Sequence, residues 1–152
     1  MEKYNFQFCQ KIVVFSSDLK SVLLCQRQGE MDHNGTYSFI GGKMETTDAS
    51  MLDGLKREKD EEVGPNFKIR ICPKYSTNLF FIKKDGSRMI LPHYYAVHVG
   101  GEIVLNEEYS GYKWVALDEL VAFEPKIKNI PETVNDLLLL AKILDDKEFI
   151  EI

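Results

Sequence analysis

One stretch of the chain, residues 50–63, is highly charged, contains no proline and ends at Gly64-Pro65. It predicts a helix, because glycine is favoured just after a helix and proline cannot continue one. Thr47, Asp48 or Ser50 can cap its first turn. Short β-branched and apolar runs lie before and after this stretch.

The strand candidates form two predicted hairpins and two single segments. Residues 12–15 and 21–27 are separated by a turn-like segment, and residues 77–83 and 88–99 flank Asp85-Gly86, which is a strong hairpin signal. Residues 37–40 form a short apolar segment that stops at a Gly41-Gly42 turn. Residues 114–117 form another short strand.

A second helix is predicted near the C-terminus. Pro131 can begin it, and apolar residues recur at helical spacing on one face: Val134, Leu137, Leu138, Ala141 and Leu144. The order of strands, helix, strands and helix predicts an α/β or α+β fold, in which a mixed sheet lies between helices. A chain of 152 residues has the size of a single domain, which we expect to span residues 1–152.

The charge balance limits the partners. Asp and Glu number 24 and Lys and Arg number 19, which gives a net charge of −5. An acidic protein is poorly suited to binding nucleic-acid backbones, whereas a small phosphorylated ligand is compatible if a metal supplies positive charge locally. The three dispersed cysteines favour buried thiols in a reducing compartment, and the longest apolar run, residues 137–141, is too short to span a membrane. We therefore expect a cytoplasmic protein with no membrane partner.

The chemistry is concentrated in the first predicted helix. Glu58 and Glu62 share one helix face, and Glu61 lies three residues after Glu58. A solvated charged face is the usual interpretation of such a run. However, the pattern Arg-Glu-x-x-Glu-Glu-x-Gly has five fixed residues of about 6% abundance each, so chance gives it at roughly one in a million positions. Clustered carboxylates are typical ligands of hard divalent cations such as Mg²⁺.

This segment resembles the Nudix box of MutT-like Nudix hydrolases, G-x5-E-x7-R-E-U-x-E-E-x-G-U, where U is a bulky apolar residue. The resemblance continues in the flanking strands, in a glutamate-containing loop and in the segment 114–120, Trp-Val-Ala-Leu-Asp-Glu-Leu. It implies an α/β/α sandwich with a mixed sheet between the helices. The residues that match the box are Gly42, Arg57, Glu58, Glu61, Glu62 and Gly64.

The box is degenerate at several positions. Asp48 replaces the first glutamate, and eight residues rather than seven separate it from Arg57. Lys59 and Pro65 occupy positions that are apolar in the family. Lys59 falls on the apolar side of the helix, so we expect its stem to pack there while its ammonium reaches outward to solvent, with a phosphate contact as the less favoured alternative.

The resemblance implies a set of site residues. Glu58, Glu61 and Glu62 would ligate Mg²⁺ or Mn²⁺ together with the Gly42 carbonyl, and Arg57 would orient this cluster by pairing with Asp48 or Glu45. The metals would neutralise the diphosphate and activate a water.

A loop outside the box supplies a further candidate. In several Nudix enzymes a glutamate of the corresponding loop is a metal ligand or the general base. Glu108, six residues before Trp114, is our candidate for both roles, with a solvated loop glutamate as the alternative. Glu58 and Glu61 are the other candidates for the base.

Substrate contacts are less well specified by the sequence. Arg27 and Lys43 are candidates for binding the substrate, although Arg27 could be an ordinary surface arginine. His93 and His98 are five residues apart on one strand and must point to opposite faces, so they do not form a metal pair.

These observations predict Mg²⁺-dependent hydrolysis of a diphosphate bond in a nucleoside di- or triphosphate or a nucleotide derivative. A catalytically weak or inactive binding module on the same fold is the alternative, favoured by Asp48, the extra residue and Lys59. An isomerase or other transferase is a third possibility that rests on fold analogy alone. Dimers are frequent in the family, so a homodimer is possible.

Overall fold

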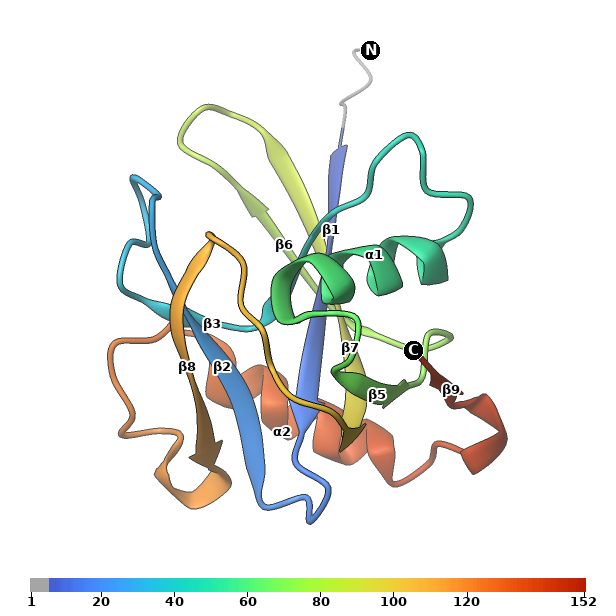
Figure 1. Ribbon diagram of the computed structural model, residues 1–152. Coiled ribbons are helices and arrows are strands. Elements are labelled where there is room, and N and C mark those ends of the chain that lie inside the picture. The colour runs from blue at the N-terminus through green and yellow to red at the C-terminus, as the bar shows by residue number, and fades with distance from the viewer. Residues whose placement is uncertain (1–5) are drawn as a thin grey trace.

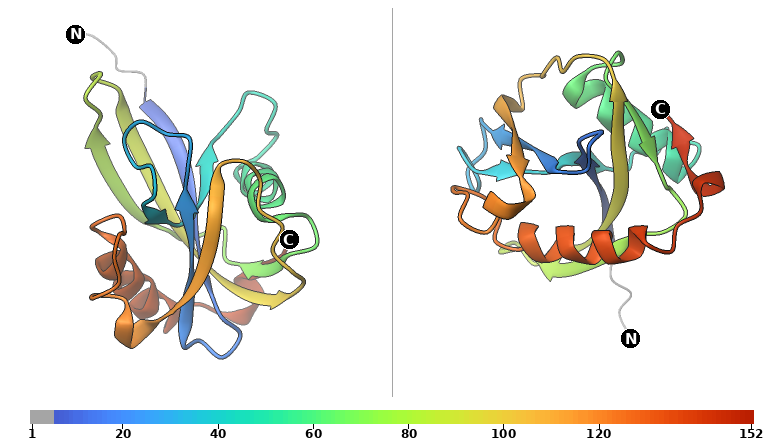
Figure 2. Two further views of the ribbon diagram at one scale, coloured as in Figure 1. Left: turned by 60° about the vertical axis from the view of Figure 1, so that its left-hand side comes forward. Right: turned by 90° about the horizontal axis from the view of Figure 1, so that it is seen from below.

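The structure is a computed structural model that describes residues 6–152, and it consists of one mixed sheet with helices on both sides (Figures 1 and 2). Within the described residues nine strands form the sheet, which has the order β3-β2-β1-β7-β5-β9, with β4 paired to β1, β6 to β7 and β8 to β2. The elements are β1 (Phe6–Phe15), β2 (Ser21–Arg27), β3 (Tyr37–Ser38), β4 (Ile40–Lys43), α1 (Met51–Val63), β5 (Lys68–Ile71), β6 (Thr77–Ile82), β7 (Arg88–Gly100), β8 (Tyr109–Ala116), α2 (Ile130–Ala141) and β9 (Ile150–Glu151).

Strand β1 organises the sheet. It pairs in parallel with β7 and antiparallel with β2 and β4, while every other strand pair is antiparallel. Both predicted hairpins are confirmed, since β1 pairs with β2 and β6 pairs with β7. The sheet is therefore mixed, as the element order predicts.

The sheet separates two hydrophobic cores. Successive side chains of β1 alternate between them: Ile12 and Val14 pack on the α1 side, whereas Val13 and Phe15 pack on the α2 side. Leu55 and Val63 of α1 belong to the first core, and Val134 and Leu137 of α2 belong to the second. This arrangement confirms the predicted sandwich of a sheet between two helices.

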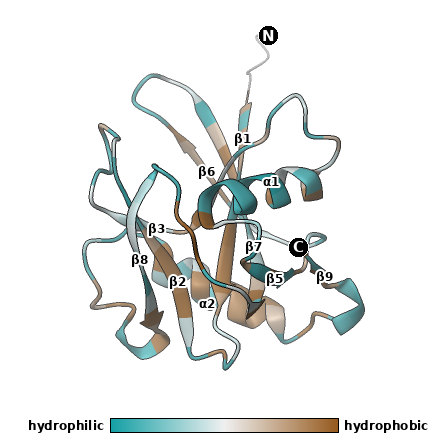
Figure 3. Ribbon diagram, viewed as in Figure 1, coloured by the Kyte–Doolittle hydropathy of each residue, from teal (hydrophilic) through white to brown (hydrophobic). Residues whose placement is uncertain are grey.

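The ends of α1 follow the predicted signals. The Ser50 hydroxyl accepts a hydrogen bond from the Asp53 amide at 3.1 Å, which caps the first turn. Gly64 follows the last turn with φ 94°, a left-handed conformation in which glycine is not strained. Figure 3 shows α1 as hydrophilic along most of its length, consistent with an exposed, charged outer face.

Several element boundaries differ from the sequence-based expectation, and helix α2 ends at Ala141, so Leu144 lies beyond it. Gly41 and Gly42 lie within strand β4 and pair with Lys11 and Gln10, so they are not a free turn. Strand β8 begins at Tyr109 rather than near Trp114, because it pairs with β2 along its whole length. Strands β5 and β9 are additional: β5 alternates polar and apolar residues over only four positions, Lys-Ile-Arg-Ile, and β9 has two residues.

Lys59 is a correction of a different kind. Its side chain is fully buried, and its ammonium donates to the Phe67 carbonyl at 2.8 Å and pairs with Asp60 Oδ1 at 2.5 Å. The expectation that the ammonium reaches solvent is therefore wrong, and so is a phosphate contact. Lys59 instead joins the end of α1 to the segment before β5, and it satisfies its charge inside the protein.

Within residues 6–152, no helix is long and apolar enough to cross a membrane.

Candidate functional site

Strand β4 and helix α1 meet at the centre of the site. A Cβ on Gly42 would lie 2.5 Å from Glu58 Oε2, so the missing side chain makes room for the Glu58 carboxylate. A Cβ on Gly41 would lie 2.1 Å from the Gln10 carbonyl oxygen, and the φ of Gly41 is 126°. The two glycines therefore allow β4 to pass between β1 and the acidic face of α1.

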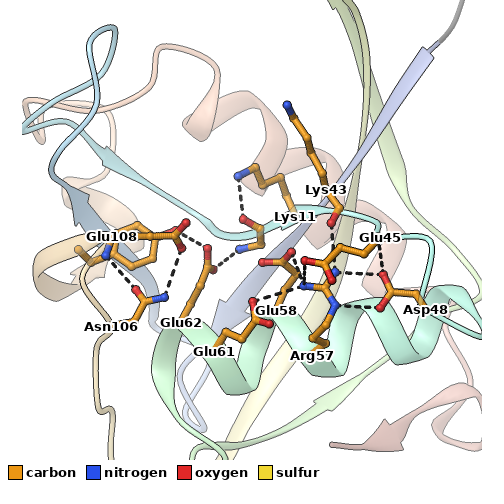
Figure 4. A network of polar contacts seen from close by, with 12 residues as sticks. Lys11, Lys43, Glu45, Asp48, Arg57, Glu58, Glu61, Glu62, Asn106 and Glu108 are labelled. Carbon is orange, nitrogen blue, oxygen red and sulfur yellow. Dashed lines mark hydrogen bonds and ion pairs between the residues drawn. The ribbon is translucent and has the colours of Figure 1, made fainter.

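Arg57 holds this acidic face and the preceding loop together (Figure 4). Its Nε and Nη2 donate to the two carboxylate oxygens of Asp48 at 2.8 and 3.0 Å, and Nη2 also donates to the Lys43 carbonyl at 3.1 Å. Its Nη1 donates to Glu58 at 2.9 Å and to Glu61 at 3.3 Å. Asp48 therefore pairs with Arg57 although it is shorter than glutamate, and the guanidinium lowers the pKa of Asp48 to about 2.

Glu45 completes the loop around Arg57. Its carboxylate lies 3.4 Å from Arg57 Nη1, and its amide donates to Asp48 Oδ2 at 2.7 Å. Arg57 thus contacts both acids that the sequence suggested as partners.

Glu62 is the most deeply buried carboxylate of the cluster, with 3% of its surface exposed. Its Oε2 accepts from the Gly41 amide at 2.6 Å, and its Oε1 accepts from the Tyr109 hydroxyl at 3.2 Å. Burial, with Glu108 and Glu58 nearby, raises the pKa of Glu62 to about 8. Burial also raises the pKa of Glu58. Positive charge placed here would stabilise both ionised carboxylates.

Glu108 is brought to the same region by a well-anchored loop. The Asn106 and Val104 amides donate to the Glu62 and Val63 carbonyls at 3.3 and 2.9 Å, which attaches the loop to the end of α1. Asn106 also contacts Glu108 directly: its Oδ1 accepts from the Glu108 amide at 3.1 Å, and its Nδ2 donates to Glu108 Oε2 at 3.4 Å.

Gln28 fixes the other side of this loop. Its amide donates to the Glu108 carbonyl at 3.0 Å, and its side chain donates to the Glu107 carbonyl at 2.9 Å. Glu108 is therefore held just before β8, close enough to influence the pKa of both Glu58 and Glu62.

These groups line a pocket of about 380 Å³. Its acidic residues are Glu30, Glu45, Glu58, Glu61, Glu62 and Glu108, and its basic residues are Lys11, Arg27 and Lys43. Such an excess of carboxylates would repel an anionic substrate unless cations were bound among them.

Comparison with known proteins identifies the family. The family model of the NUDIX domain matches residues 9–137. The chain belongs to the Nudix family. Its match contains the box, the pocket and the loop that carries Glu108.

Solved structures share the Nudix fold at low sequence identity. A MutT protein from Methanosarcina mazei Go1 has a TM-score of 0.73 and 19% identity, covering 93% of this chain and 99% of the other. A C. elegans Ap4A hydrolase in a binary complex has a TM-score of 0.70 and 16% identity, covering 91% and 99%. The NUDIX domain of Shewanella oneidensis NrtR, complexed with ADP ribose, has a TM-score of 0.65 and 19% identity, covering 91% and 90%. No curated protein matches the chain significantly.

The carboxylates that line the pocket are chemically suitable ligands for divalent metal ions. Across residues 6–152, no three His, Cys, Asp or Glu side chains are already arranged as a metal site. The pocket nevertheless gathers carboxylate oxygens from α1 and from the Glu108 loop around the space beside Gly42, and these are the hard ligands that Mg²⁺ prefers. Burial raises the pKa of Glu58 even though the Arg57 guanidinium donates to it, so further positive charge would stabilise its ionised form.

The predicted substrate-binding residues have different surroundings. Arg27 lines the pocket, but its guanidinium forms a two-pronged ion pair with Glu30. Lys43 also lines the pocket, and Figure 4 shows its ammonium pointing away from the carboxylates. His93 packs against Phe39, whereas His98 stacks on Phe67 on the other side of the sheet, as their spacing predicts.

The sequence-based interpretation missed four contributors to the site: Lys11, Gln28, Asn106 and Tyr109 as a partner of Glu62. Lys11 carried a signal, because it is a charged residue in a strand whose other residues are apolar or uncharged. Gln28 and Asn106 are polar loop residues and carried none.

Proposed function

We propose that this Nudix protein is a Mg²⁺- or Mn²⁺-dependent hydrolase that cleaves a diphosphate bond in a nucleoside di- or triphosphate or a nucleotide derivative. The observation that carries this proposal is the convergence of Glu58, Glu61, Glu62 and Glu108 on one pocket beside Gly42. Burial and mutual repulsion of these carboxylates favour bound divalent cations.

Each residue has a defined task in the proposed reaction. Glu58, Glu61, Glu62 and Glu108, with the Gly42 carbonyl, would hold the metal. The bound metal supplies charge neutralisation of the diphosphate and lowers the pKa of a water. Arg57 is a positioning residue, because its hydrogen bonds within residues 6–152 go to Asp48, Glu58, Glu61 and the Lys43 carbonyl.

Glu108 is the proposed general base. It lies in the pocket, and Asn106 and Gln28 fix its backbone from opposite sides. A carboxylate held in this way can accept the proton of the attacking water. Arg57 donates hydrogen bonds to the carboxylates of Glu58 and Glu61, which makes them less basic. These two residues are therefore weaker candidates for the general base.

The decisive experiment is a panel of nucleoside triphosphates, nucleotide sugars, ADP-ribose and dinucleoside polyphosphates, incubated with Mg²⁺ or Mn²⁺ and scored by product mass. We expect at least one diphosphate bond to be cleaved, with no cleavage in the presence of a chelator. Glu58→Gln is the matched inactive control, because it keeps the shape of the side chain and removes its charge.

The alternative is a binding module without turnover. It is favoured by Glu62, whose two carboxylate oxygens both accept hydrogen bonds from the protein. Nucleotide binding without any product on the panel would support the module and contradict the hydrolase. A cytoplasmic location and a homodimer stay predictions alongside the proposed activity.

A further inference from the structure

Lys11 is an unusual residue for its position. It lies in the middle of β1, paired with Gly41 on one side and with His93 of β7 on the other. Its neighbours Gln10 and Ile12 are fully buried. Placing a cation in such a strand costs free energy of desolvation unless the charge has a partner.

The described part of the protein gives the Lys11 ammonium one hydrogen bond and no ion pair. The Lys11 ammonium donates to the Gly41 carbonyl at 3.2 Å. No carboxylate of residues 6–152 lies within ion-pair distance of it, although the ammonium has three protons to donate.

Lys11 lies beside the carboxylate cluster of the pocket. Lys11 lines the pocket of the carboxylates, and its ammonium meets the carbonyl of the Gly41 residue whose amide donates to Glu62 (Figure 4). The two other cations of the pocket lining differ: Arg27 is paired with Glu30, and the Lys43 ammonium points away from the carboxylates. Lys11 is thus the cation that is both close to the cluster and incompletely partnered.

We propose that Lys11 is a phosphate-binding residue of the pocket, which contacts the diphosphate of the substrate at the end nearest Gly41 and Glu62. A lysine ammonium suits this task as a compact positive charge that donates to phosphate oxygens. This inference rests on the proposed function, because it assigns a substrate contact to the same site.

The first test measures binding of inorganic pyrophosphate in saturating Mg²⁺ by calorimetry. Lys11→Met should weaken binding about ten- to a hundredfold, the loss expected for one hydrogen bond to a charged group. Lys11→Arg should recover most of the affinity. Lys68→Met is the control, because Lys68 is an exposed strand lysine outside the pocket, and it should bind pyrophosphate like the original protein.

A second measurement separates substrate contact from a purely structural role. Mn²⁺ binding without pyrophosphate, followed by electron paramagnetic resonance, should be unchanged or tighter in Lys11→Met, because a positive charge beside the carboxylates is removed. If Lys11 only held the Gly41 peptide, Mn²⁺ affinity and melting temperature would fall together, and that outcome would overturn the proposal.

Kinetics on the cleaved nucleotide distinguish this inference from the proposed function. Lys11→Met should raise KM or lower kcat/KM by a similar factor. If the original protein turns over substrate, and Lys11→Met has the same KM and the same pyrophosphate affinity, the inference is rejected and the hydrolase is kept. Pyrophosphate binding that depends on Lys11, without turnover of any nucleotide, would keep the inference and reject the hydrolase. Absence of both pyrophosphate binding and turnover would overturn the inference and the proposed function.

Discussion

Gly42 illustrates how one missing side chain controls this site. The Glu58 carboxylate occupies the space where a Cβ would stand, at distances of 2.5–2.6 Å. Glu58 is the end of a flexible side chain and can move aside, so the backbone itself is not forced to shift. The requirement for glycine is therefore a requirement of the carboxylate position rather than of the fold.

Gly42→Ala should consequently separate activity from stability. Displacing the Glu58 carboxylate by about 1 Å should lower kcat/KM about a hundredfold, while the melting temperature changes little. Enzyme kinetics and thermal denaturation of the same preparation check this. A variant that loses stability and activity to the same extent would show that the backbone needs the glycine.

Arg57 acts through its neighbours at the same scale. Arg57→Ala removes the partner of Asp48, Glu58 and Glu61 at once and leaves three carboxylates close together. We expect the melting temperature to fall by about 3–6 °C and activity to fall as well. Normal melting with complete loss of turnover would instead indicate that Arg57 contacts the substrate.

At the scale of elements, α1 serves as both the acidic wall of the pocket and a wall of the core. Lys56 and Lys59 both pair with Asp60 at 2.5 Å, yet Lys56 has half of its side chain exposed and Lys59 is buried. Lys59 also donates to the Phe67 carbonyl, so it connects α1 to the segment that leads into β5. The two lysines of this helix therefore pair with the same carboxylate in different environments, one exposed and one buried.

This pair provides a matched comparison. Lys59→Met should lower the free energy of unfolding by about 2 kcal/mol or more, because the buried Phe67 carbonyl loses its donor and Asp60 loses one partner. Lys56→Met should cost less than about 1 kcal/mol, as expected for an exposed ion pair. Urea denaturation measures both, and equal losses would contradict the structural role of Lys59.

The loop before β8 is the second element that decides function. Its anchoring by Asn106 and Gln28 supports Glu108 as the base. Glu108→Gln should reduce kcat by a factor of about 10² to 10⁴, while Mn²⁺ binding is largely kept because Glu58, Glu61, Glu62 and the Gly42 carbonyl remain as proposed ligands. Glu107→Gln is the control and should retain most of the activity. Near-normal turnover in Glu108→Gln, with an inactive Glu58→Gln, would assign the base to the box helix.

At the scale of the whole molecule, the sandwich buries polar groups on both sides of the sheet. His93 lies in the centre of β7 with 4% of its surface exposed, and its Nδ1 is 2.9 Å from the Leu91 carbonyl. Burial lowers the pKa of His93 to about 4, from an ordinary value of about 6.5. Lys11, its neighbour on β1, also disfavours the imidazolium.

The pH dependence of stability follows from this shift. Above about pH 7 His93 is neutral in both states and contributes nothing. Between about pH 6.5 and 4 only the unfolded chain binds the proton, so His93 lowers stability as pH falls, by up to about 3 kcal/mol. Denaturation at several pH values should show a shallower decline in His93→Gln. An identical decline in both proteins would contradict the buried neutral histidine.

The sequence by itself determined the features that depend on local spacing. The caps and charged face of α1, both hairpins and the sandwich class follow from patterns within one or two elements, and the box glutamates follow from a match over a short segment. Such signals are readable because helix and strand periodicity fix which neighbouring side chains share a face.

Only the tertiary structure decided which distant residues meet at the site. The pairing of β1 with β4 brings Lys11 to Gly41, and the anchoring of the loop before β8 brings Asn106 and Glu108 to the end of α1. The burial of Lys59 likewise depends on the Phe67 carbonyl, which lies outside the helix. The physical reason is that strand register and helix packing are set by the whole core, whereas a local pattern records only the preference of each segment.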